Sequence, residues 1–179
     1  MYLREETLDS VGRFIAVTAA SWMDNGLIKP NSYGVGIHLA DQPGSDFMDA
    51  LTYNFGESRD GGKHDKVWYM DNAEGKIRIC LKSGMDSHEA IRVWQGMLLD
   101  LENAFPWGGA VIDTHYGLIV GVSGFEEDED ILFARTIRNW VVKRMDRMGQ
   151  ILLDAARQRG ELWSGGDPSV DDYRFTRLD

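Results

Sequence analysis

Gly121-Val122-Ser123-Gly124 precedes the acidic run Glu126-Glu127-Asp128-Glu129-Asp130, and this short window decides the fold. Residues 118–122 are rich in β-branched side chains and predict a strand, and Gly124 can turn the chain at a φ that other residues resist. The acids then face the positive end of a helix dipole, which predicts that a helix begins directly after the turn. Adjacent carboxylates on a helix point in different directions, so we expect a solvated first turn here rather than a metal site.

The residues after the acidic run predict a long amphipathic helix. Apolar side chains recur at steps of three and four, which places them on one buried stripe and leaves the charges on the other face. We expect the helix to be broken near Gly149 and to finish at Gly160. The stripe consists of Ile131, Ala134, Ile137, Val141, Met145 and Met148.

Composition limits the class of protein. The chain has 179 residues with 43% hydrophobic content, which favours one domain with a well-filled core. Its formal net charge of −10 argues against nucleic acid and anionic membrane surfaces as partners. Residues 1–10 are charged and lack an apolar core, so no signal peptide is predicted. A single cysteine cannot form an internal disulfide, and a cytoplasmic location is the default expectation.

Helical and strand-like patterns alternate along the chain. We expect a helix over 5–23, ended by Asn25 and Gly26, and later a helix from Asp86 to Phe105 that opens with a capping-box pattern through Glu89. The order of elements predicts an antiparallel sheet with helices packed against it, an α+β fold. The other expected elements are a strand over 33–39, a short helix over 47–53, a polar surface loop over 56–66, a hairpin of strands 67–70 and 77–81, a second hairpin of strands 110–115 and 118–122, and the final helix.

Residues 65–145 resemble a known family. The run from Val67 to Ile79, interpreted as a strand, an aspartate, a glycine turn and a strand, is similar to the opening of the GlcG/HbpS-like family of haem-degrading or haem-binding uptake proteins. Met85-Asp86, Gly108-Gly109 and Gly121-Val122-Ser123-Gly124 with Glu127 and Asp128 follow in the family's order. A related haem-degrading-domain-like group, with a phenylalanine before the paired glycines, is a second resemblance because Phe105 precedes Gly108.

The resemblance implies a profilin-like or PAS-like sheet with flanking helices, in two or three layers, assembled into dimers or larger oligomers. It divides the single domain into an N-terminal helix with an atypical insertion (1–64), a core (65–160) and a polar tail (161–179). The insertion over 26–65 departs from the family and is a candidate pocket cover or interface.

Haem, or another tetrapyrrole, is the cofactor that the resemblance suggests, and it needs an axial donor beside an apolar slot. The candidate donors are His88, Met85 and His115, while His38 and His64 are weaker candidates. Gly108, Gly109, Ser123 and Gly124 are the expected ligand-facing edge. Neither paired histidines nor paired cysteines occur at metal-ligand spacing, so no metal site is predicted.

The sequence is compatible with three functions. The first is a small-molecule-binding module of the GlcG/HbpS type, forming a homo-oligomer. The second is an enzyme that uses the Ser123-Gly124 turn and the following helix start as an anion site, with catalytic residues unknown. The third is a regulatory or assembly subunit that uses Trp163, Phe175 and the tail as an interface. Cys80, expected on the less apolar face of its strand beside Arg78 and Lys82, is interpreted as structural.

Overall fold

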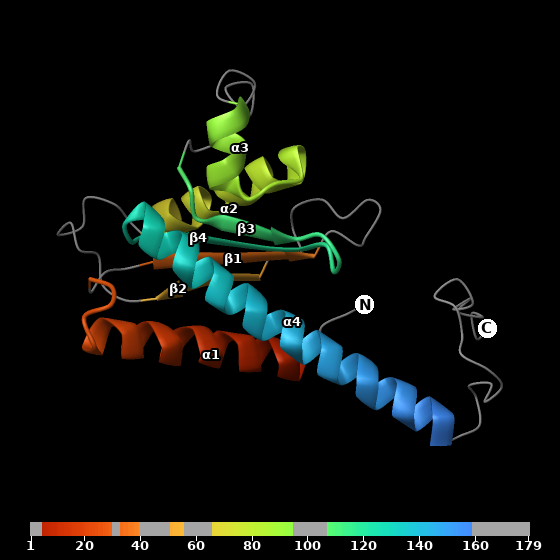
Figure 1. Cartoon of the computed structure of the whole chain (residues 1–179). Helices are drawn as coiled ribbons and strands as arrows, with labels where there is room; N and C mark the ends of the chain where they lie inside the picture. The colour runs from red at the N-terminus through yellow and green to blue at the C-terminus, as the bar shows by residue number, and fades with distance from the viewer. Residues whose placement is uncertain (1–4, 30–32, 40–50, 56–65, 95–106, 159–179) are drawn as a thin grey trace. The chain divides into compact units, whose positions relative to one another are not determined.

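A sheet of four antiparallel strands, in the order β2-β1-β4-β3, organises the protein (Figure 1). The structure, a computed structural model, describes residues 5–29, 33–39, 51–55, 66–94 and 107–158. In chain order its elements are α1 (Glu5–Asp24), β1 (Tyr33–Leu39), β2 (Leu51–Phe55), α2 (Lys66–Ser83), α3 (Ser87–Trp94), β3 (Ala110–Asp113), β4 (Leu118–Ser123) and α4 (Glu127–Gln158).

The central strands β1 and β4 are apolar on one face and carry a run of small residues on part of the other. Gly36 of β1 lies opposite Gly121 of β4, and Gly34 lies opposite Ser123. Because successive side chains of a strand point to opposite faces, these residues share one face, and Tyr33, which alternates with them, lies on the other. Every residue of β4 is buried, so this strand is at the centre of the fold.

Helix α2 packs on the glycine-lined face at very short range. A β-carbon placed on Gly36 would lie 2.7 Å from Ile77 Cδ1, and one placed on Gly121 would lie 2.6 Å from the Ala73 carbonyl oxygen. A β-carbon on Gly34 would come within 2.7 Å of the Tyr69 carbonyl. Side chains at these three positions would push the helix away from the sheet, so their absence allows α2 to pack this close to it.

The opposite face is covered by α1 and by the first part of α4. The Tyr33 ring meets Phe133 of α4 edge-on, with a centroid distance of 5.8 Å, and Phe133 in turn contacts Trp22 of α1 at 5.1 Å. Farther along, Phe14 stacks on Trp140 at 4.5 Å. The sheet is therefore the middle of three layers, with α2 on one side and α1 and the first part of α4 on the other (Figure 1).

The chain divides into two units, Met1–Val142 and Lys143–Asp179. The sheet and its covering helices belong to the first. The described part of the second is the C-terminal half of α4, where Gln150 Nε2 donates a hydrogen bond of 2.9 Å to Asp154 Oδ1. Among the residues that the structure describes, no helix combines the length and hydrophobicity that crossing a membrane requires.

The predicted hairpin over 67–81 is wrong, because these residues lie within the single helix α2. The run Asp71 to Gly75 has turn composition, but Gly75 is buried inside the helix and Asp71 is exposed on its outer side. Tyr69, Ala73, Ile77 and Cys80 recur at helical spacing and are all buried. The short apolar runs on either side of the polar residues thus belong to one helical face, and the strand-turn-strand part of the family resemblance is not present.

Two further predictions are corrected. Leu51 to Tyr53, predicted within a short helix, form part of β2, while residues 47–50 lie outside the described ranges. Helix α4 continues through Gly149, and Met148, placed on the predicted buried stripe, is 42% exposed. The stripe is otherwise confirmed, since Ala134, Ile137, Val141 and Met145 are buried and Ile131 is partly so.

The remaining predicted elements are confirmed in the described residues. They are α1 with its end near Gly26, strand β1, the helix start beside Asp86, the β3–β4 hairpin and the helix start after Gly124. Together they confirm an α+β fold with an antiparallel sheet and flanking helices. Of the predicted loop over 56–66, Lys66 instead begins α2, and residues 56–65 lie outside the described ranges. The predicted helix beyond residue 94, the end of the last helix at Gly160 and the tail over 161–179 also lie outside them.

Candidate functional site

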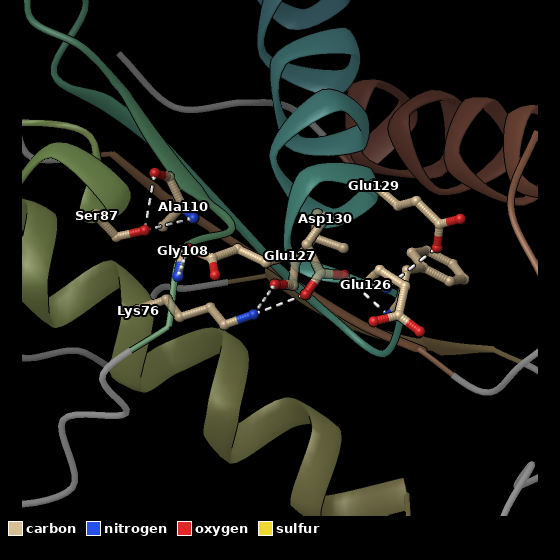
Figure 2. A network of polar contacts seen from close by, with 10 residues as sticks. Lys76, Ser87, Gly108, Ala110, Glu126, Glu127, Glu129 and Asp130 are labelled. Carbon is tan, nitrogen blue, oxygen red and sulfur yellow. Dashed lines mark hydrogen bonds and ion pairs between the residues drawn. The ribbon is translucent and has the colours of Figure 1, made fainter. Parts of the chain in front are cut away.

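Lys76 of α2 and Asp130 of α4 form a buried ion pair at the end of the sheet where β4 runs into α4 (Figure 2). The Lys76 Nζ to Asp130 Oδ2 distance is 2.8 Å, and the two side chains are 2% and 4% exposed. Lys76 Nζ also donates to the Val122 carbonyl oxygen at 2.8 Å. One ammonium group therefore ties α2 to β4 and to the start of α4, and its removal would leave a buried carboxylate without a counter-charge.

Asp130 also caps its own helix. Its Oδ1 accepts the Phe125 N–H at 3.0 Å, while Glu129 Oε2 accepts the Glu126 N–H at 3.1 Å. Burial raises the pKa of Asp130 to about 6, and the neighbouring Lys76 ammonium opposes that rise. The expectation of a wholly solvated acidic turn is thus wrong at Asp130, although Glu126, Glu127 and Asp128 are exposed.

The same contacts bear on the anion site predicted at the Ser123-Gly124 turn. An anion site at a helix start needs free backbone N–H donors. The Phe125 and Glu126 donors are occupied by carboxylates of the protein itself. The negative charge of the acidic turn would also repel an anion, so these two donors do not supply an anion site.

Gly108 and Gly109 line the other side of the ion pair. Gly109 has a φ of +120°, and a β-carbon there would lie 2.8 Å from Lys76 Nζ and 2.7 Å from the Val122 carbonyl oxygen. Gly108 donates its N–H to Glu127 Oε1 at 2.9 Å. We call the set Lys76, Gly108, Gly109, Ser123, Gly124 and Asp130 the glycine end of the sheet.

His88 lies beside this glycine end, in the first turn of α3. Its Cβ is 3.0 Å from the position that a β-carbon on Gly108 would occupy. Its Nδ1 is buried and has no hydrogen-bond partner in the described part of the chain. Met85, the second predicted donor, instead packs against the small core formed by Ile79 and Ala90.

His115 is not brought to the same place. It follows β3, whose other end adjoins Gly109, and it lies exposed in the β3–β4 turn against the ring of Tyr116 at 4.6 Å. Asp113 Oδ1 shapes that turn by accepting the N–H groups of His115 and Tyr116. Of the weaker candidates, His38 is buried in β1 and His64 lies outside the described ranges.

The outer edge of β3 is occupied by side chains. Ser87 Oγ accepts the Ala110 N–H at 2.9 Å and donates to the Ala110 carbonyl oxygen at 3.2 Å. Asp86 Oδ1 accepts the Ile112 N–H at 2.9 Å, and Arg138 donates to the Ile112 carbonyl oxygen at 3.4 Å. Exposed strand edges are templates for pairing with other chains, and these contacts remove the template at Ala110 and Ile112.

Sequence reasoning missed Lys76 and Asn72, because it assigned their segment to a hairpin. Asn72 is fully buried, and neither its Oδ1 nor its Nδ2 has a hydrogen-bond partner among the described residues. A helical interpretation of 66–83 would have found both, since they lie three or four positions from the apolar Tyr69, Ala73 and Ile79. Polar residues at core positions of an amphipathic helix are the signal that was available.

Cys80 is in the core rather than on a polar face. It packs with Ile77, Ala110 and Ile119 and has no exposed area. Burial, assisted by the negative charge of Asp86, raises the pKa of its thiol. Within the described ranges, no three or more His, Cys, Asp or Glu side chains gather in an arrangement that could hold a metal ion.

No family model and no curated protein matches this sequence. Among solved structures, the chain matches the crystal structure of the Klebsiella pneumoniae protein ORFY, which is described by the family model DUF336. The match has a TM-score of 0.49 and 14% sequence identity, and it covers 72% of this chain and 85% of ORFY.

Proposed function

We propose that this protein is a small-molecule-binding module whose ligand site adjoins the glycine end of the sheet. The observation that carries the proposal is the buried Nδ1 of His88, which lies next to Gly108 and has no hydrogen-bond partner among the described residues. Buried polar groups in folded proteins nearly always have a partner, so an exception at the edge of a structured site favours a ligand role. His88 as a whole residue is half-buried.

Haem or a related tetrapyrrole is the ligand class that we propose first. Such ligands need an imidazole or similar donor together with apolar surface. Trp107 directly precedes Gly108 and is 48% exposed, so a large aromatic side chain stands next to the glycine pair that His88 adjoins. The resemblance of the paired glycines and the Gly121 to Gly124 turn to the GlcG/HbpS-like family supports the same choice.

Absorbance titration with haemin tests this proposal. We expect a Soret shift that saturates at stoichiometric haemin in the wild-type protein and is lost in His88→Ala. His115→Ala is the matched control, because this histidine is exposed at the other end of β3, and it should titrate like the wild type. Absence of a shift in the wild type, or a full shift in His88→Ala, would refute the axial role of His88.

We also propose that the protein forms a homo-oligomer. Large apolar side chains remain exposed on the described chain, among them Val17 at 69% and Val93 at 64%. Exposed apolar surface of this kind is a frequent feature of interfaces. Native mass spectrometry reports subunit number and bound ligand together, and a purely monomeric spectrum at micromolar concentration would contradict this part of the proposal.

A further inference from the structure

Asn72 carries unused hydrogen-bonding capacity in the interior. Its side chain is 0% exposed, and both Oδ1 and Nδ2 are without partners in the described chain. A carboxamide offers two N–H donors and an acceptor oxygen. Leaving all of them unpaired away from water is costly, so a fully buried amide of this kind requires an explanation.

The surroundings of Asn72 are polar on one side. Asn72 precedes Lys76 by one helical turn, so the two side chains lie on the same face of α2. The Tyr69 carbonyl abuts Gly34, which pairs with Ser123, and the Ala73 carbonyl abuts Gly121, so the turn that holds Asn72 lies over these two neighbouring rows of the sheet. Ser123 shares the α2-facing side of the sheet with Gly34 and is itself 5% exposed. An amide, a hydroxyl and an ammonium group therefore occupy one end of the interface between α2 and the sheet.

The charge in this region is already balanced. Lys76 pairs with Asp130 at 2.8 Å, so an added anion would meet the Asp130 carboxylate and an added cation would meet the Lys76 ammonium. Because α2 approaches the sheet closely at Gly34 and Gly121, the interface between them disfavours a large ligand. The surroundings favour a small uncharged molecule that both donates and accepts hydrogen bonds.

We propose that Asn72 and Ser123 form a buried binding site for one water molecule. A water can donate to Asn72 Oδ1 while accepting from Asn72 Nδ2, from the Ser123 hydroxyl or from the remaining proton of Lys76. Buried waters typically make about three such bonds to groups that are otherwise unsatisfied. The site uses Ser123 and Lys76 of the glycine end but neither His88 nor Trp107, so it does not depend on the proposed function.

Water ¹⁷O relaxation dispersion, which counts long-lived internal waters, tests the site with Asn72→Leu. We expect one long-lived water fewer in Asn72→Leu than in the wild type, and no change in Asn139→Leu, whose asparagine is exposed on α4. Equal counts in Asn72→Leu and the wild type would overturn the proposal. Ser123→Ala should shorten the residence time of the same water.

Two measurements keep the proposal testable if the relaxation signal of the variant is affected by unfolding. Asn72→Leu should lower the melting temperature, because it destroys a satisfied network, whereas a rise in melting temperature would show that the amide had no partner and would overturn the proposal. In a high-resolution crystal structure of the wild type, we expect a density peak within hydrogen-bond distance of both the Asn72 amide and Ser123 Oγ. Direct contact of the amide with protein atoms instead would refute the site.

Discussion

Lys76 and Asp130 are 54 residues apart in sequence and meet through a 2.8 Å contact that solvent does not reach. The contact joins helices on opposite faces of the sheet, around the end of β4. Buried ion pairs contribute little net stability compared with apolar replacements, but breaking one by removing a single partner is strongly destabilising. The behaviour of this pair under substitution is therefore a direct test of the fold.

Lys76→Met should lower the free energy of unfolding by about 3 to 5 kcal/mol, because Asp130 is then buried without a counter-charge. Urea denaturation measures the effect. Lys82→Met, at an exposed position in the last turn of the same helix, should change it by less than about 0.5 kcal/mol. The double variant Lys76→Met/Asp130→Leu should recover much of the loss, and a double variant as unstable as the single one would contradict the pairing.

Asp130 should make stability depend on pH. Its pKa is raised from 3.8 to about 6 in the folded protein, so the folded state holds the proton more tightly than the unfolded state. The stabilising contribution of that proton is fully present below about pH 4 and is lost as the pH rises through about 6. Relative to Asp130→Asn, which does not titrate, the wild type should lose on the order of 2 to 3 kcal/mol across this window. Parallel pH profiles of the two proteins would rule out the raised pKa.

Gly109→Ala should destabilise the protein by more than backbone strain alone. Its φ of +120° disfavours alanine, and the new methyl group would also clash with the Val122 carbonyl and the Lys76 ammonium. Gly84→Ala separates the two effects, since Gly84 has a φ of +69° but open space around it. We expect a loss of about 1 to 2 kcal/mol at Gly84 from strain and a clearly larger one at Gly109 in chemical denaturation. Equal losses would mean that the loop can move away from Lys76.

Ser87→Ala should open the edge of β3. The variant loses the hydrogen bonds to both backbone groups of Ala110, at a cost of about 1 to 3 kcal/mol. Hydrogen exchange of the Ala110 amide should accelerate, while the Val120 amide on β4 changes less. Ser21→Ala, at an exposed site of α1, is the control and should leave both rates unchanged. Unaltered exchange at Ala110 in Ser87→Ala would show that the serine does not protect the edge.

Cys80 should be unreactive in the native state. Its thiol is buried and its pKa is raised, so very little thiolate is available to a reagent. In native buffer, a chromogenic disulfide such as DTNB should react far more slowly than it does in denaturant. Stoichiometric labelling at the same rate in both conditions would place the thiol on the surface.

The parts of the fold that were predictable from sequence are those with one unambiguous signal. Gly124 and the following acids fix the β4–α4 junction, and the spacing in α1 and the β3–β4 hairpin is equally clear. Helix α2 was not predicted because Asp71 to Gly75 have the composition of a turn. Packing of the helix against the sheet overrides that local preference. Lys76 was missed for the same reason, since its position is informative only once its helix is known. His88 was chosen from its place at a predicted helix start, and the glycine pair from the family resemblance.

The glycine-lined contact of α2 with the sheet bears on how distant homologues can be recognised. The packing of α2 directly on the backbone of the sheet depends on two places far apart in the sequence, the neighbouring Gly34 and Gly36 of β1 and Gly121 of β4. A distant homologue that keeps this packing needs small residues at all three positions, even where every apolar side chain has been exchanged for another. A Gly-x-Gly strand followed by a glycine in a later strand is therefore the pattern that we expect such a homologue to keep.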